Sequence, residues 1–125
     1  AASDVYKRQY LDAGKVEGAM DDLKILAKDT RNIYGAEAKY KVAQIYFDAG
    51  QTEQAEKEVL DYIEVSTPHT YWLARSFVLL SDVYMKLGRN LDAKQYLLSL
   101  KQNYQADDDI AGMIESRLNK LNAEN

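Results

Sequence analysis

The stretch YFDAG at positions 46–50 has two counterparts in this chain, YLDAG at 10–14 and YMKLG at 84–88. In each copy a tyrosine precedes a glycine by four residues, and an alanine follows the glycine by five. An aliphatic residue follows each alanine by four, and the three glycines lie 36 and 38 residues apart. Matched sites in three copies indicate an internal structural repeat.

The spacing of apolar residues predicts two antiparallel helices in each copy, because they recur every three or four positions. Gly50 is expected to take the left-handed backbone conformation that ends a helix. Ala55 is then the small residue at which the second helix crosses the first, near Ala43, and Ser81 and Ala93 have the same roles in the next copy.

Composition narrows the classes of function. The chain has 125 residues, with 16 basic and 20 acidic side chains, a net charge of −4, no cysteine and a single histidine. The acidic balance argues against a nucleic-acid partner, because neutralising phosphates needs a basic surface. The lack of cysteine excludes disulfides and thiolate chemistry. No run of apolar residues is long enough to insert into a membrane.

The two complete copies resemble tetratricopeptide repeats, whose pattern is aromatic, leucine, small residue and tyrosine on one helix, then alanine, aromatic and proline on the next. The match departs at Lys39, where an aromatic residue is usual, and the spacing exceeds the family's period of about 34 residues. The matching residues are Val42, Ala43, Tyr46, Ala55, Val59 and Pro68 in one copy, and Phe77, Leu80, Ser81, Tyr84, Ala93 and Leu97 in the next.

This resemblance implies an all-α fold, a right-handed α-solenoid of antiparallel helix pairs with about two and a half repeats and a C-terminal capping helix. In the cap, Asp107, Asp108 and Asp109 would lie at the helix N-terminus. The expected units are a partial repeat at 10–35, repeats at 36–70 and 71–105, and the cap at 106–125. Helices are expected at 16–28, 36–49, 52–65, 71–87, 90–104 and 108–122.

The first nine residues are expected not to be native. Residues 3–9, SDVYKRQ, resemble the in-frame translation of an adapter used in shotgun sequencing libraries. Fusion scars of this kind are excluded from reasoning about the fold. The native N-terminus is then expected to be missing, while the C-terminal cap indicates that the native C-terminus is present.

No residue pattern points to catalysis. The carboxylates are expected on solvated helix faces, and residues 107–109 lack the ligand spacing of a calcium loop. His69 is a ligand, a base or, as we favour, a surface loop residue. Trp72 is expected to pack between repeats rather than stack on a ligand. We therefore predict no enzyme activity, no catalytic residue, no metal and no cofactor.

A protein or peptide partner is better supported. In tetratricopeptide repeats, positions on the first helix of each pair line a concave groove that holds extended peptides or partner helices. Tyr40, Phe47 and Met85 would be exposed apolar anchors there, while Arg75 and the acids would set the register. These side chains could also only face water or pack against neighbouring helices. The residues of this chain that correspond to the groove positions of the family are Glu37, Tyr40, Gln44, Phe47, Arg75, Val78, Asp82 and Met85.

The resemblance argues against recognition of a terminal carboxylate. The positions that would carry basic clamp residues hold Gln44, Leu79 and Asp82, and only Arg75 and Lys41 are basic nearby. The predicted function is a protein–protein interaction scaffold. The alternative is a regulatory or docking appendage of an enzyme or sensor whose catalytic domain lies upstream.

Two further expectations concern context. The incomplete first repeat is expected to leave Leu23, Ile25 and Leu26 partly uncovered, which would promote self-association. The aromatic-rich repeats resemble those of bacterial proteins, including cell-envelope ones, and the compartment stays open.

Overall fold

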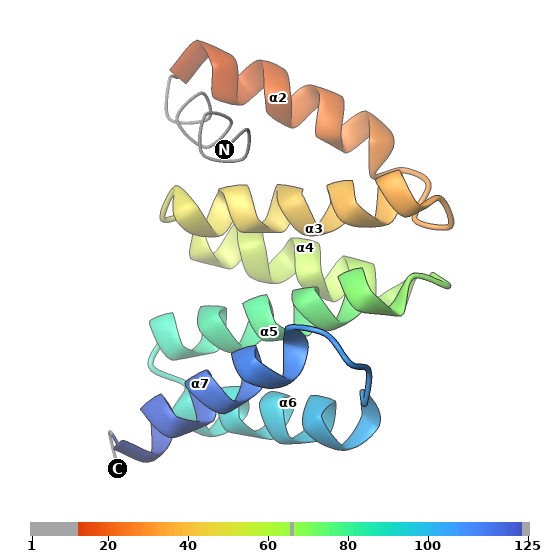
Figure 1. Ribbon diagram of the computed structural model, residues 1–125. Coiled ribbons are helices and arrows are strands. Elements are labelled where there is room, and N and C mark those ends of the chain that lie inside the picture. Colours follow the sequence, from red (N-terminus) through yellow and green to blue (C-terminus); the bar gives the residue numbers. More distant parts are fainter. Residues whose placement is uncertain (1–12, 66, 124–125) are drawn as a thin grey trace.

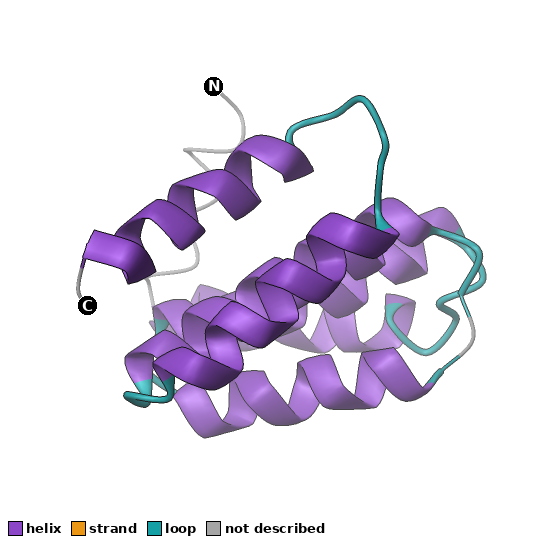
Figure 2. Cartoon of the chain, turned by 90° about the horizontal axis from the view of Figure 1, so that it is seen from below, coloured by secondary structure: helices purple, strands orange, loops and turns teal. Residues whose placement is uncertain are grey.

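The computed structural model describes residues 13–65 and 67–123, with side chains from residue 18 onward, and this part of the chain is all-helical. In Figure 1 the earlier helices follow one another from top to bottom, and the last helix lies beside the two before it, while Figure 2 shows the helices joined only by loops. They are α2 (Ala13–Leu26), α3 (Ile33–Asp48), α4 (Thr52–Glu64), α5 (Thr70–Lys86), α6 (Asn90–Asn103) and α7 (Ile110–Ala123).

The helices lie where the apolar spacing predicted them, with ends shifted by up to three residues. The largest shifts are at the starts of α2 and α3, which begin at Ala13 and Ile33 rather than at residues 16 and 36. The earlier start of α3 has a local cause, since the Asn32 side chain accepts a hydrogen bond of 2.8 Å from the Tyr34 backbone N–H. The adapter-like segment 3–9 lies outside the described residues.

A glycine follows the first helix of each helix pair, Gly50 after α3 and Gly88 after α5. Gly50 and Gly88 have φ angles of 79° and 76°, in the left-handed region that favours glycine. After α3, the Gln51 N–H donates to the Tyr46 carbonyl at 2.8 Å, and the Gly50 N–H donates to the Phe47 carbonyl at 3.0 Å. The same pair of bonds closes α5, so both turns are Schellman motifs and the prediction for Gly50 is confirmed.

Small side chains are buried in both antiparallel helix pairs. Ala43 of α3 and Ala55 of α4 are buried, as are Ser81 of α5 and Ala93 of α6. Within each pair the helices run in opposite directions (Figure 1). Successive pairs then pack through α4 against α5, and α3, α5 and α7 form one continuous row of contacts.

Helix α7 closes the C-terminal side of the core. Its apolar residues Ile110, Ile114, Leu118 and Leu121 are all buried, and Met113 is partly buried against the same cluster. The helix packs on both α6 and α5. Asp108 caps it, because its Oδ1 accepts a hydrogen bond of 2.9 Å from the Ile110 N–H.

The end of α2 exposes apolar side chains. Ile25 is 63% exposed and Leu26 is 50% exposed, while Leu23 is partly buried. The expected uncovering of this segment is confirmed, and the self-association inferred from it stays a prediction. None of the helices within the described ranges combines the length and apolar character needed to cross a bilayer.

Alkaline conditions are expected to weaken the contact between α5 and α6. Burial, reinforced by the neighbouring Glu56 carboxylate, raises the pKa of Tyr84 from 10.0 to about 12. A raised phenol pKa stabilises the folded state fully below pH 10, and this contribution is lost as the pH rises through 12. Urea unfolding across this interval is expected to show a smaller fall in stability for Tyr84→Phe than for the unmodified chain. Tyr34→Phe, at an exposed side chain, is the matched control, and equal slopes for both variants would contradict the prediction.

Candidate functional site

The residues predicted for the groove lie on α3 and α5, but they do not all face solvent. Glu37, Gln44, Phe47, Arg75, Asp82 and Met85 are partly buried side chains along these two helices. Tyr40 is only 7% exposed and Val78 only 3%, and both belong to the hydrophobic core. The expectation that Tyr40 is an exposed anchor is therefore wrong. The helical period places Tyr40 close to the line where α3 meets α5, so its ring packs inward.

Arg75 is the centre of a polar network between α3 and α5. Its Nη2 donates to the Tyr40 hydroxyl at 3.1 Å, and its guanidinium carbon lies 5.0 Å from the centre of the Tyr40 ring. The Tyr40 hydroxyl donates in turn to Gln44 Oε1 at 2.8 Å, and Gln44 Nε2 donates to Asp48 at 2.8 Å. The network fixes the neighbouring turns of the two helices relative to each other.

The network continues toward the start of α7. Arg75 Nη1 donates to the Tyr71 hydroxyl at 2.9 Å, and that hydroxyl donates to Asp109 Oδ1 at the same distance. Burial is the main cause that raises the pKa of Tyr71 above its ordinary value, which favours the neutral hydroxyl that donates this hydrogen bond. Trp72 packs beside both tyrosines, with ring-centre distances of 5.6 Å to Tyr40 and 5.0 Å to Tyr71. Trp72 of α5 thus packs against α3, as expected for a residue between successive helix pairs.

A second polar contact joins α5 to α7. The Asp82 carboxylate accepts two hydrogen bonds from Arg117, at 2.8 Å from Nε and 2.9 Å from Nη2. This bidentate geometry is the favoured one for arginine and a carboxylate. The negative charge of Asp82 is therefore largely neutralised, and Asp82 holds the capping helix in place.

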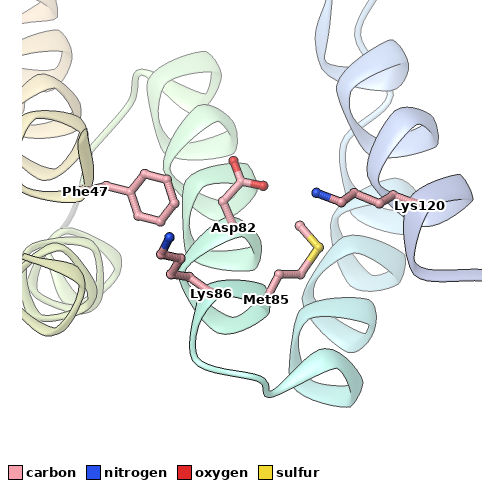
Figure 3. A pocket seen from close by; sticks show the side chains of 5 residues that line it. All are labelled: Phe47, Asp82, Met85, Lys86 and Lys120. Carbon is pink, nitrogen blue, oxygen red and sulfur yellow. The ribbon is translucent and has the colours of Figure 1, made fainter. Parts of the chain in front are cut away.

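A shallow hollow of about 360 Å³ lies between α3, α5 and α7. Figure 3 shows Phe47 on one side, Lys120 on the other, and Asp82, Met85 and Lys86 from α5 between them. The Phe47 ring and the Met85 thioether supply its apolar surface, while the two lysines supply positive charge. The hollow brings together Phe47, Asp82 and Met85, three of the predicted site residues.

Sequence reasoning missed Lys86, Arg117 and Lys120. Lys86 follows Met85 directly and could have been assigned to the same surface from the helical period. The other two are on α7, which was interpreted only as a cap. The view that only Arg75 and Lys41 are basic near the groove is therefore corrected.

The residues that line the hollow offer apolar and charged contacts. In the described ranges 13–65 and 67–123, no three His, Cys, Asp or Glu side chains lie close enough together to hold a metal ion. His69 donates a hydrogen bond of 2.8 Å from Nε2 to the Arg31 carbonyl oxygen, which joins two loops at the surface. Comparison of the chain with protein-family models, curated proteins and solved structures finds no match.

Proposed function

We propose that this chain is part of a right-handed, tetratricopeptide-like α-solenoid that binds a peptide or a partner helix in a groove along α3, α5 and α7. Two features support the architecture. The glycine turns at Gly50 and Gly88 recur with the same hydrogen bonds, and small residues are buried at equivalent positions of the two helix pairs. Helix α7 takes the place that the first helix of another repeat would have, beside α5.

The observation that carries the binding proposal is the hollow that Phe47 and Met85 line. Both side chains are partly exposed and lie on neighbouring helices, so an apolar group seated between them would lose water on several sides. Charged side chains surround this apolar surface, as in interfaces where a central apolar anchor is ringed by polar groups. A scaffold that holds such a hollow between rigid helices binds with little reorganisation.

Peptides selected on this protein are expected to bind through the hollow. A phage-displayed library of random dodecapeptides is panned against the unmodified chain, and the affinity of each selected peptide is measured by fluorescence anisotropy. The double variant Phe47→Ala/Met85→Ala is expected to lower affinity by about tenfold or more, because both walls of the apolar anchor site are lost.

The control removes apolar side-chain atoms from a helix outside the groove. Leu91 and Leu98 are exposed on α6, so Leu91→Ala/Leu98→Ala should leave affinity unchanged. Thermal unfolding of both double variants checks that the fold is kept. Equal losses for the two doubles, or selected peptides that bind the Phe47/Met85 variant as well as the unmodified chain, would overturn the proposal.

A further inference from the structure

The charge in the hollow differs in sign from that of the whole chain. The chain has a net charge of −4, yet Lys86 and Lys120 both line the hollow. The carboxylate beside them, Asp82, is already engaged by both oxygens with Arg117. Because Asp82 is paired with Arg117, the two lysines leave a local charge of about +2 at the hollow, whereas the net charge of the whole chain is negative.

Lys86 and Lys120 have no acidic partner among the residues that the structure describes. Across residues 18–65 and 67–123, neither the Lys86 nor the Lys120 ammonium lies within 4.0 Å of a carboxylate oxygen. Asp48, which follows Phe47 at the end of α3, accepts a hydrogen bond from Gln44. Other basic side chains on α3, α5 and α7 form ion pairs with carboxylates, such as Lys41 with Glu37 at 2.7 Å.

The lysines reach the hollow from two different helices. Lys86 extends from α5 on the side of Phe47, and Lys120 extends from α7 on the side of Met85 (Figure 3). Each ammonium group therefore lies next to one of the two apolar side chains. A ligand that places an apolar group between Phe47 and Met85 would bring its neighbouring atoms close to positive charge on either side.

From this arrangement we infer that the groove selects a peptide segment in which aspartate or glutamate lies next to an aliphatic or aromatic side chain. The inference rests on the proposed function and names the chemistry of its partner. The apolar side chain contacts Phe47 and Met85, and the side-chain carboxylates form ion pairs with Lys86 and Lys120. A basic segment is disfavoured, because it would meet two like charges.

The test uses defined peptides and a signal from inside the hollow. The chain contains three methionines, so selective ¹³C-methyl labelling gives few resonances, and Met85 is the one that lines the hollow. The probes are acetylated, amidated nonapeptides with a Gly/Ser background and a central Leu-Glu-Glu, Leu-Gln-Gln, Ser-Glu-Glu or Leu-Lys-Lys. Amidation removes the terminal carboxylate, so any carboxylate effect comes from the side chains.

The Leu-Glu-Glu peptide is expected to shift the Met85 methyl signal and to bind about three- to tenfold more tightly than the Leu-Gln-Gln and Ser-Glu-Glu peptides. Lys86→Gln and Lys120→Gln should each reduce the advantage of Leu-Glu-Glu over Leu-Gln-Gln, and added salt should do the same. Lys57→Gln, at an exposed lysine on α4, is the control and should leave the advantage unchanged.

The outcomes separate the two proposals. If Leu-Glu-Glu and Leu-Gln-Gln bind equally and both shift Met85, the groove binds apolar peptides and the carboxylate inference is overturned. If Ser-Glu-Glu binds as tightly as Leu-Glu-Glu, the paired apolar contact is overturned. If no peptide shifts Met85 at millimolar concentration while the spectrum of the fold is intact, the groove function itself fails.

Discussion

Tyr40→Ala is expected to lower the free energy of unfolding by about 3 kcal/mol or more, as is usual for removing a buried aromatic side chain. The Tyr40 ring is 7% exposed and packs against Trp72 at a ring-centre distance of 5.6 Å. Its hydroxyl also accepts a hydrogen bond from Arg75 and donates one to Gln44. The variant therefore leaves a cavity and two unpaired polar groups between α3 and α5. Urea unfolding followed by circular dichroism at 222 nm measures the loss.

Two companion variants separate the causes. Tyr40→Phe keeps the ring and removes the hydroxyl, so we expect a loss of about 1 kcal/mol from the broken hydrogen bonds. Phe47→Ala, on the same helix but partly exposed in the hollow, should cost clearly less than Tyr40→Ala. If Tyr40→Ala is as stable as Phe47→Ala, the Tyr40 ring lies on the surface and becomes available to a partner, contrary to the structure.

Gly35→Ala is expected to destabilise the protein by about 2–3 kcal/mol through a steric clash where α2 and α3 meet. A Cβ atom on Gly35 would lie 1.8 Å from the Asp29 carbonyl oxygen and 2.7 Å from that of Leu26. Both are backbone atoms, so the loop after α2 would have to move away from the first turn of α3. Thermal and urea unfolding report the loss of stability.

Gly112→Ala is the matched control for Gly35→Ala. Gly112 lies within α7, and a Cβ atom there would have no neighbour within 4 Å. Because alanine favours the helix more than glycine does, this variant should gain about 0.5–1 kcal/mol. If both substitutions stabilise the protein, the close approach of α2 to Gly35 is wrong.

Sequence reasoning placed the candidate site residues on the correct helices but did not predict which of their side chains are covered. Helical spacing correctly assigned Glu37, Gln44, Phe47, Arg75, Asp82 and Met85 to the two helices that share a surface. It could not separate Tyr40 from Phe47, because both are aromatic and lie on the same side of α3. Only the distance and angle between α3 and α5 decide which ring is covered, and these depend on side chains from both helices.

The repeat motif itself determined the all-helical class, the positions of the helices and the turns at Gly50 and Gly88, because these features depend on residues close together in the chain. Tertiary structure alone decided the surroundings of Asp82, Lys86 and Lys120. Arg117 lies 35 residues from Asp82, and no local pattern predicts that α7 brings Arg117 to that carboxylate and Lys120 to the hollow. The charge of a surface built from three helices is set by how they pack, and packing involves contacts across the whole chain.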